Sequence, residues 1–460
     1  MVKYHRFALD YLTEWKDRNT RKPLVIRGAR QVGKSFLVHM FAEKHFKDLL
    51  EINFEFSTDA SSLFRSGSPE TILPLLEAAY NTRIVPGETL LFLDEIQAAP
   101  DVFASLRYFH EKMPELHIVS AGSLLEFVLK EHSFSMPVGR IEYLHLGPMR
   151  FEEFLLALKR DSLYEWLSGW SPGEEVPSAL HSEALNMVKQ YHLVGGLPEA
   201  VKAFASAGSF KECAQVQQSV LSTFRDDFNK YAQRAKHSRV QKIFDKVPEL
   251  IGRKFKYSHV DREERSRDLK PALELLSLAR VLHPVFHTYA NGIPLKAEIN
   301  EKIFKVLFLD TGLLCRSLGL SILDFEQAED ILLVNNGAVC EQFIGQELLY
   351  AGELFEEPRL FYWMREKKNS SAEVDYVYAL GSMVFPVEVK AGKTGTLKSL
   401  HVFLGEKNRS FGLRFNSTEP SLVKARTNRA NGHAHDFTLL SLPLYFSGQA
   451  LRLSRAITLL

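Results

Sequence analysis

The feature that most constrains the fold of this chain is the motif G-x-x-x-x-G-K-S at residues 28–35. An apolar run at 24–26 precedes it and a helical pattern follows it, which is the strand, loop and helix setting of a phosphate-binding loop. The glycines let the backbone curl so that N–H groups and the positive end of the helix face a phosphate. Lys34 would contact the terminal phosphates, and the Ser35 hydroxyl could bind Mg²⁺. The predicted nucleotide-binding residues are Gly28, Ala29, Arg30, Gln31, Val32, Gly33, Lys34 and Ser35.

Composition sets broad limits on the class of protein. The chain of 460 residues can hold two to four domains, and its 45% hydrophobic and 25% charged residues are ordinary for a globular protein. Because no apolar run approaches the roughly eighteen residues of a membrane helix, and the first residues lack a signal-peptide core, we expect a cytoplasmic protein without membrane contact. The net charge of +1 does not indicate a nucleic-acid binder, although a balanced total can hide a local basic face. Cys213, Cys315 and Cys340 form no metal or redox spacing and are expected as buried free thiols.

A second apolar run ends in two acidic residues. Residues 89–93 are typical of a strand that is buried on both faces of a parallel sheet, and Asp94 and Glu95 follow directly. In P-loop ATPases the first acid of such a pair holds the Mg²⁺ shell and the second polarises the attacking water. Such a pair alone would more often be a solvated strand end. Its place downstream of a phosphate loop favours the catalytic interpretation.

Several further segments accompany these motifs. They are Leu-Asp-Glu-Ile-Gln at 93–97, Ala-Gly-Ser at 121–123, Val-Gly-Arg at 138–140, Phe-Glu-Glu-Phe at 151–154, Gly-Gly-Leu-Pro at 195–198 and Arg-Asp-Asp-Phe at 225–228. Over nearly its whole length the chain resembles a prokaryotic family of AAA-type P-loop ATPases, whose C-terminal domain was long classed as being of unknown function. The resemblance implies ATP and Mg²⁺ as cofactors and a homo-oligomer, with a hexameric ring as one form.

Two residues beyond the acidic pair have roles that the sequence leaves open. Ser123 follows a strand predicted at 116–120, where ring-forming ATPases place the group that senses the γ-phosphate; a helix N-cap is an equal alternative that is compatible with it. Arg140 lies in a loop from which a guanidinium could reach the nucleotide of a neighbouring subunit, and a solvated arginine is the alternative. We predict Lys34, Glu95, Ser123 and Arg140 as catalytic residues.

The middle of the chain is predicted to be mostly helical. Residues 151–235 suggest a helical lid over the nucleotide, interrupted at 195–198 by a turn that could be a hinge but is more often a helix stop. Between 236 and 325, two helices and two strand-like segments predict a winged helix-turn-helix that contacts DNA. In the alternative, the wing contacts protein and the charges are solvated. The predicted DNA-binding residues are Arg253, Lys254, Lys256, Arg265, Arg267 and Lys270.

The C-terminal part carries a second group of acidic residues. A predicted helix with Glu341 is followed by a strand at 360–363, a hairpin strand with Asp375, and a strand with Glu388 and Lys390. Because side chains alternate between the two faces of a strand, Glu388 and Lys390 lie on the same face, and the hairpin brings Asp375 alongside. This is the core pattern of the PD-(D/E)XK nucleases, in which Asp375 and Glu388 would bind Mg²⁺, Lys390 would orient a water and Glu341 would complete the site. A site that binds DNA ends without cutting them is the open alternative.

The expected fold class is α/β. It comprises a P-loop AAA-type ATPase core at 1–150, a helical lid at 151–235, a winged helix-like domain at 236–325 and a restriction-endonuclease-like domain at 326–460. The expected function is a Mg-dependent ATPase that couples ATP hydrolysis to DNA binding or remodelling. Two alternatives stay open: a motor on branched DNA with a non-cleaving nuclease fold, and a regulatory signalling-type ATPase whose C-terminal domain binds protein.

Overall fold

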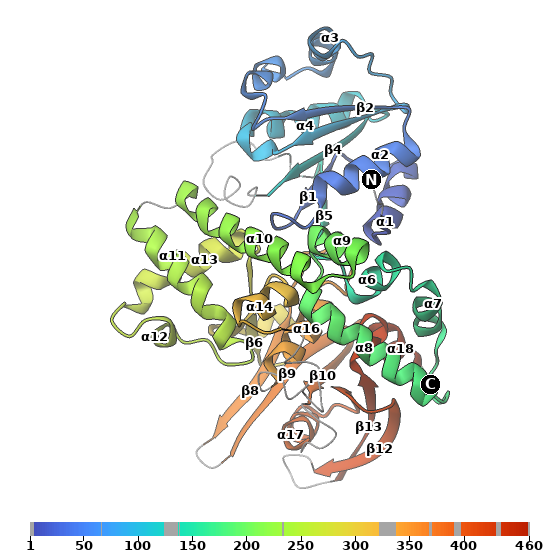
Figure 1. The fold of residues 1–460 in the computed structure, drawn as a ribbon, viewed down its shortest axis with the longest axis vertical. Coiled ribbons are helices and arrows are strands. Elements are labelled where there is room, and N and C mark those ends of the chain that lie inside the picture. The colour runs from blue at the N-terminus through green and yellow to red at the C-terminus, as the bar shows by residue number, and fades with distance from the viewer. Residues whose placement is uncertain are drawn as a thin grey trace. The chain divides into compact units, whose positions relative to one another are not determined.

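The computed structural model describes residues 4–65, 67–123, 137, 139–231, 234–321, 337–367, 370–390, 397–428 and 434–458. The chain divides into two compact units (Figure 1). The first is Met1–Pro148 with the short segments Leu278–Arg280 and Gly352–Glu357, and the second is Met149–Ser277, Val281–Ala351 and Pro358–Leu460. Within the described residues, every helix is too short or too polar to span a lipid bilayer.

The first unit contains a parallel sheet of five strands in the order β2-β3-β4-β1-β5. Its strands are β1 (Leu24–Arg27), β2 (Asp48–Asn53), β3 (Thr89–Asp94), β4 (His117–Gly122) and β5 (Glu142–His145). Its helices are α1 (Ala8–Asp17), α2 (Lys34–His45), α3 (Pro69–Tyr80) and α4 (Pro100–Lys112). The predicted strands at 24–26, 89–93 and 116–120 are confirmed, and the loop at 28–35 joins β1 to α2.

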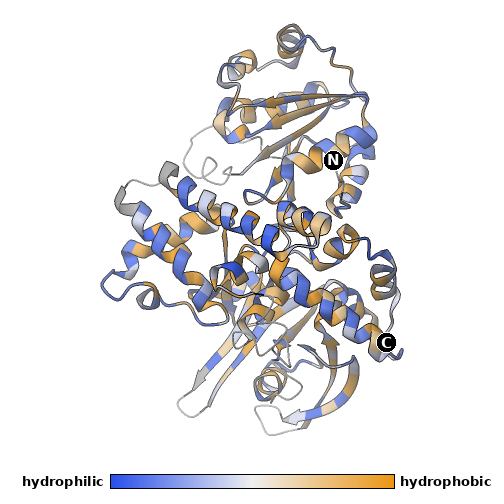
Figure 2. Cartoon of the chain, in the orientation of Figure 1, coloured by the Kyte–Doolittle hydropathy of each residue, from blue (hydrophilic) through white to orange (hydrophobic). Residues whose placement is uncertain are grey.

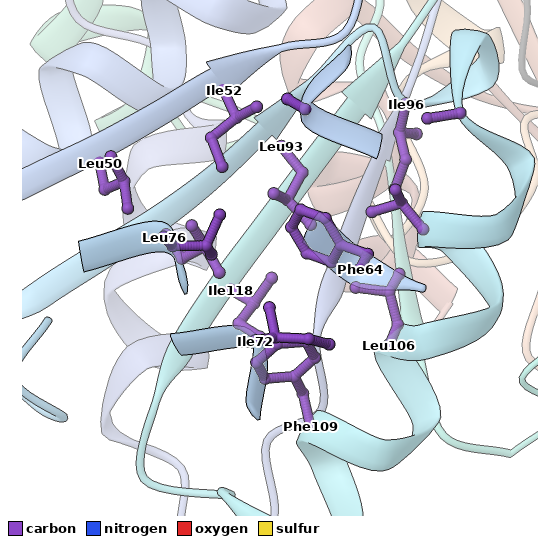
Figure 3. Close-up of a cluster of buried hydrophobic side chains, with 14 of the residues drawn as sticks. Leu50, Ile52, Phe64, Ile72, Leu76, Leu93, Ile96, Leu106, Phe109 and Ile118 are labelled. Atoms are coloured by element: carbon purple, nitrogen blue, oxygen red, sulfur yellow. The ribbon is translucent and has the colours of Figure 1, made fainter. Parts of the chain in front are cut away.

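The core of the first unit explains why its strands are uninterrupted apolar runs. Every residue of β3 and β4 is buried, because helices cover both faces of the sheet. Figure 2 shows these strands coloured mostly as hydrophobic. On one face, strand side chains pack against α3 and α4, as Figure 3 shows for Leu50, Ile52, Leu93, Ile118, Ile72, Leu76, Leu106 and Phe109. The packed sheet fixes the carboxyl ends of β1, β3 and β4 beside one another.

The second unit contains a mixed sheet of eight strands in the order β12-β13-β11-β10-β9-β8-β6-β7. Its strands are β6 (Leu282–Thr288), β7 (Ile299–Phe308), β8 (Phe361–Lys367), β9 (Ser370–Leu380), β10 (Met383–Val389), β11 (Phe411–Asn416), β12 (Ser421–Asn428) and β13 (Ala434–Pro443). The antiparallel hairpin β6–β7, predicted as a wing, pairs through β6 with β8. The expected wing strands therefore belong to the same sheet as the C-terminal strands. The domain boundary at 325 stays a prediction.

The second unit also contains helices. They are α6 (Phe151–Ala157), α7 (Asp161–Gly169), α8 (Ser178–Val194), α9 (Pro198–Ala207), α10 (Phe210–Tyr231), α11 (Arg234–Lys246), α12 (Tyr257–Val260), α13 (Ser266–Leu278), α14 (Thr311–Ser317), α16 (Ala338–Leu349), α17 (Lys398–Lys407) and α18 (Ala450–Thr458). Of these helices, α14, α16 and α17 pack against this sheet. The helical pattern predicted for 151–235 is confirmed for its described residues, whereas its role as a lid stays a prediction. Helix α17 packs on one sheet face through Leu400, Phe403 and Leu404.

The turn between α8 and α9 is a helix stop that is packed tightly. Gly195 has φ 72°, and a Cβ added there would lie 2.1 Å from Asp310 Oδ1. The backbone N–H of Gly196 donates a hydrogen bond of 2.7 Å to Asp310 Oδ2. Glycine is needed here because the backbone approaches a buried carboxylate closely. The geometry favours the helix-stop interpretation over the hinge.

The three cysteines are free and buried, as predicted. Burial raises the pKa of the Cys213 thiol to about 12, and it also raises the pKa of Cys315. Because the thiolate is the reactive form, burial makes Cys213 and Cys315 poor nucleophiles.

Candidate functional site

The phosphate-binding loop has the backbone geometry that its glycines predict. Helix α2 begins at Lys34, and Gly33 before it has φ 88°, in the left-handed region that favours glycine. A Cβ added to Gly28 would lie only 2.3 Å from the carbonyl oxygen of Leu146. Both positions therefore require glycine, one for its dihedral angle and one for close packing. The first turn of α2 has N–H groups without partners inside the helix, which is the arrangement that binds a phosphate.

The Lys34 ammonium is held inside this loop. It donates hydrogen bonds to the carbonyl oxygens of Gly28 at 3.1 Å and Ala29 at 2.9 Å, and the residue is only 8% exposed. A residue that the sequence analysis missed fixes the same loop: Arg6 donates to the carbonyl oxygens of Val32 at 3.0 Å and Gly147 at 2.9 Å. An arginine this far upstream carried no motif that could have revealed it.

The structure brings Ser35 and Asp94 together. The Ser35 hydroxyl donates to Asp94 Oδ2 at 3.1 Å, and the Asn53 amide donates to the same oxygen at 3.2 Å. Burial, together with the neighbouring charge of Glu95, raises the pKa of Asp94. A serine hydroxyl beside a carboxylate is the oxygen set that Mg²⁺ prefers, so these residues fit the ion that the motif implies. Asn53, at the end of β2, was not predicted as a site residue.

Glu95 lies in a network of polar side chains beside Asp94. Its backbone has φ 49°, a left-handed conformation that is uncommon outside glycine and that clusters at functional sites. Its Oε2 accepts hydrogen bonds from the Ser123 hydroxyl at 3.3 Å and from the Gln97 amide. The Arg30 guanidinium donates to Ser123 Oγ at 3.2 Å. The network thus joins the phosphate loop, β3 and β4 through side chains that could fix the position of Glu95.

Arg140 is not part of this network. Its guanidinium donates to Glu111 Oε1 at 2.8 Å, and both side chains are about half exposed. An exposed pair of this kind contributes little to stability and is easily exchanged for another partner. The role of Arg140 towards a neighbouring subunit stays a prediction.

The second unit gathers carboxylates around a lysine that the sequence analysis missed. Lys305, on β7, is buried, and its ammonium lies 2.9 Å from Glu341, 2.6 Å from Glu373 and 3.7 Å from Asp375. Burial alone would lower the pKa of Lys305, but the surrounding carboxylates hold it well above its ordinary value. Burial raises the pKa of Glu341 to about 7 against the opposing effect of Lys305. We call Lys305, Glu341, Glu373 and Asp375 the lysine-centred cluster.

The predicted Glu388 and Lys390 lie beside this cluster. The Lys390 ammonium pairs with Glu388 Oε1, and Asp375 Oδ2 accepts a hydrogen bond of 2.8 Å from the Val389 N–H. Burial and the charge of Asp375 raise the pKa of Glu388 to about 8. Among the residues that the structure describes, no group of three His, Cys, Asp or Glu side chains has the arrangement of a metal site. Glu341, Asp375, Glu388 and Lys390 are thus near one another, as expected, but with Lys305 among the acids.

The six predicted DNA-binding residues divide into two places. Gly252 approaches the lysine-centred cluster so closely that a Cβ there would lie 2.8 Å from Glu341 Oε2, and Arg253 and Lys256 follow it with exposed side chains. Lys254 in the same segment is half-buried. The other three residues are exposed and lie at the start of α13 or just before it: Arg265, Arg267 and Lys270.

Two of the α13 residues have acidic neighbours. Arg267 lies 4.0 Å from Asp268, and Lys270 lies 3.9 Å from Glu274. A phosphate contact at either place stays a prediction.

Other motifs of the sequence have structural roles in the second unit. The buried Glu153 caps α6 by accepting a hydrogen bond of 2.8 Å from the Arg150 N–H. Glu152, next to it, is buried and accepts a hydrogen bond from the Gln449 amide. Arg225 forms an ion pair of 2.8 Å with Asp245. These residues hold helices in place and have no evident catalytic arrangement.

Three separate parts of the chain match models of known protein families. Residues 20–155 match a family model described as an AAA domain. Residues 185–324 and 336–445 match two models described as domains of unknown function, DUF8612 and DUF4143. A search of curated proteins found no significant match.

The solved structures with similarity to the chain include PCH-2, an ORC2 protein and Hsp104. PCH-2 of C. elegans is 12% identical, with 45% of this chain and 64% of that chain covered and a TM-score of 0.26. The ORC2 protein of Aeropyrum pernix in its ADP form is 12% identical, with coverages of 62% and 87% and a TM-score of 0.30. The Hsp104–ADP complex of S. cerevisiae is 13% identical, with coverages of 59% and 38% and a TM-score of 0.25.

TM-scores at this level do not establish a shared architecture over the whole chain. The assignment depends instead on the AAA-domain match over 20–155, which spans the phosphate loop, Asp94, Glu95 and Ser123. This part of the chain has the phosphate loop and acidic pair of a P-loop ATPase and is similar to AAA domains.

Proposed function

We propose that this protein is a Mg-dependent ATPase that couples ATP hydrolysis to binding or remodelling of DNA through a nuclease-like C-terminal domain. The observation that supports the DNA part is the close approach of Gly252 to Glu341 in a segment that continues with the exposed basic residues Arg253 and Lys256. Lys and Arg side chains that contact phosphates supply most of the sequence-independent affinity of a protein for DNA.

The nucleotide chemistry follows from the first unit. Lys34 and the N–H groups at the start of α2 would bind the β- and γ-phosphates, and Ser35 and Asp94 would hold Mg²⁺. The ion would neutralise charge that develops on the phosphates. Glu95 would orient the attacking water, and Ser123 and Arg30 would keep Glu95 in position through their hydrogen bonds.

The order of elements in the second unit supports a nuclease-like fold. Helix α16 carries Glu341, the antiparallel strands β8, β9 and β10 carry Asp375 and Glu388, and α17 leads to β11, which is parallel to β10. A helix, three strands and a following helix is the order expected from the sequence pattern, and the structure adds the parallel strand β11. The basic segment after Gly252 supplies the positive charge that such a fold needs to hold DNA.

DNA binding can be tested by fluorescence anisotropy with labelled single-stranded, duplex and branched DNA at low salt. We expect Arg253→Ala/Lys256→Ala to weaken binding at least about tenfold and to reduce the slope of log affinity against log salt by about 2. The matched control is Lys44→Ala/Lys47→Ala, which removes two exposed lysines of the first unit. The proposal fails if wild type binds none of these DNAs at low salt, or if the two double variants bind alike.

A second candidate is a motor on branched DNA in which the nuclease-like fold does not cut. The position of Lys305 among the acidic residues favours it, because the carboxylates already have a cation. A cleavage assay with Mg²⁺ and Mn²⁺ on wild type, Asp375→Ala and Lys390→Ala separates the two candidates. Products that disappear in both variants support a nuclease, whereas no products, or equal products in all three proteins, support the motor.

Assembly is part of the proposal. A homo-oligomer, with a hexameric ring as one form, would let Arg140 exchange Glu111 for the nucleotide of a neighbouring subunit. Its exposed ion pair can be broken at small cost. Size-exclusion chromatography with light scattering, with and without ATP, measures this assembly.

A further inference from the structure

The acidic residues of the nuclease-like fold surround an ammonium group. Lys305 Nζ lies within 4 Å of one oxygen each of Glu341, Glu373 and Asp375, at 2.9, 2.6 and 3.7 Å. The lysine side chain is almost fully buried, at 3% exposure. A buried ammonium is retained only where carboxylates compensate its charge, and these three do so.

The lysine is fixed in this position by more than its ion pairs. It lies on β7, a strand of the same sheet as β9, which carries Glu373 and Asp375. The ring of Tyr362, on β8 between them, lies 5.3 Å from the ammonium, within reach of a cation–π interaction. The Tyr376 hydroxyl donates to the Glu341 carbonyl at 2.7 Å and so holds α16 against the sheet. Strand order and helix packing together keep the ammonium between the carboxylates.

A divalent cation does not fit beside this ammonium. A cation bound by Glu341 and Asp375 would share their oxygens with the Lys305 ammonium. The two positive charges would then repel each other where little water screens them. The neighbouring Glu388 is in the same situation, since Lys390 pairs with one of its oxygens. Lys390 was part of the predicted site, whereas the ammonium of Lys305 among Glu341, Glu373 and Asp375 was not.

We infer that Lys305 takes the place of a divalent metal ion in the lysine-centred cluster, so that this cluster does not bind Mg²⁺ or Mn²⁺ in the wild-type protein. Lys305 comes from β7, outside the segment that carries the nuclease pattern. The fold thus supplies from a neighbouring strand the positive charge that a nuclease would obtain from a metal. Whether Lys305 or a metal ion neutralises these carboxylates can be decided independently of DNA binding.

Mn²⁺ alone, titrated into nucleotide-free protein and followed by electron paramagnetic resonance, tests this inference. All proteins carry Asp94→Asn, which removes the carboxylate of the ATPase metal site. In this parent we expect the same Mn²⁺ binding with and without Asp375→Asn. Adding Lys305→Met should create one new site at least about tenfold tighter than any in the parent, and adding Glu341→Gln to that variant should remove the new site. Adding Lys305→Arg, which keeps the charge, should create none.

Two results would overturn the inference. One is Mn²⁺ binding by the parent that disappears with Asp375→Asn, because the wild-type cluster would then hold a metal. The other is a folded Lys305→Met protein, checked by circular dichroism, that gains no site. If Lys305→Met does not fold, the comparison of the parent with its Asp375→Asn form decides: equal Mn²⁺ binding supports the inference, and loss of a site contradicts it.

Discussion

The Ser35 hydroxyl lies 3.1 Å from Asp94 Oδ2, although the two residues are 59 positions apart in the sequence. The contact joins the phosphate loop after β1 to the end of β3, because β1 and β3 are parallel and are separated only by the buried strand β4. It unites the two motifs from which ATP binding was predicted. The first three predictions follow from this arrangement.

Lys34→Ala should reduce ATP hydrolysis by at least about 100-fold, because it removes a positive charge at the terminal phosphates. The carbonyl oxygens of Gly28 and Ala29 hold this ammonium group in the loop. Steady-state phosphate release measures the rate, and titration with a fluorescent ATP analogue measures binding. Lys44→Ala is the matched control, since this lysine is exposed near the end of the same helix. Turnover by Lys34→Ala at the rate of this control would contradict the assignment of the loop.

Glu95→Gln should keep ATP binding, lose hydrolysis and trap bound ATP in an oligomer. The amide keeps the size of the side chain but cannot orient and polarise a water as a carboxylate does. Size-exclusion chromatography with light scattering measures the assembly with ATP, with ADP and without nucleotide. An oligomeric state that does not change with nucleotide would count against a ring.

Ser123→Ala should lower kcat by about five- to tenfold with little change in KM, because Glu95 loses a hydrogen bond and the Arg30 guanidinium loses its acceptor. Ser120→Ala, on β4 three residues before Ser123, is the matched control: its hydroxyl donates to the Leu24 carbonyl and is not part of the Glu95 network. Equal kcat values for the two serine variants would show that Ser123 only caps a helix or fills space.

His192 should make the second unit sensitive to acid. Burial lowers the pKa of this histidine from 6.5 to about 3, so the unfolded chain takes up its proton first as the pH falls. Its contribution to stability is therefore complete above pH 6.5 and is lost between pH 6.5 and about 3. At pH 5 the loss amounts to about 2 kcal/mol.

Denaturant unfolding at pH 8 and pH 5 measures this contribution. The decrease in unfolding free energy on acidification should be about 2 kcal/mol smaller in His192→Leu than in wild type. The exposed His259→Leu, on α12, should behave as wild type. If His192→Leu and wild type lose the same stability between the two pH values, His192 does not become charged on unfolding.

The elements that could be predicted from the sequence are those that local pattern determines. The loop at 28–35 was identifiable because two glycines, a lysine and a serine at fixed spacing have few other uses, and β3 because a strand buried on both faces is an apolar run. The helix with Glu341 and the strand with Asp375 were predicted from periodicity and are confirmed as α16 and β9. Each of these signals lies within a few consecutive residues.

The contacts that could not be predicted depend on strand order. Lys305 looked like an ordinary charge in a wing strand, and only the pairing of β6 with β8 places it among Glu341, Glu373 and Asp375. Arg6 contacts the phosphate loop through backbone carbonyls, which every residue has, so its sequence environment gave no signal. Periodicity predicts which residues share a strand face, but it does not predict which strands lie side by side.

The most direct test of the central claim is the ATP hydrolysis rate measured at low salt with and without saturating branched or single-stranded DNA. The account predicts that at least one of these DNAs changes the rate of the wild type several-fold and that Arg253→Ala/Lys256→Ala responds much less. Lys44→Ala/Lys47→Ala should respond as the wild type does. A wild-type rate that is the same with every DNA, in protein that hydrolyses ATP and binds no DNA at low salt, would contradict the coupling of ATP hydrolysis to DNA.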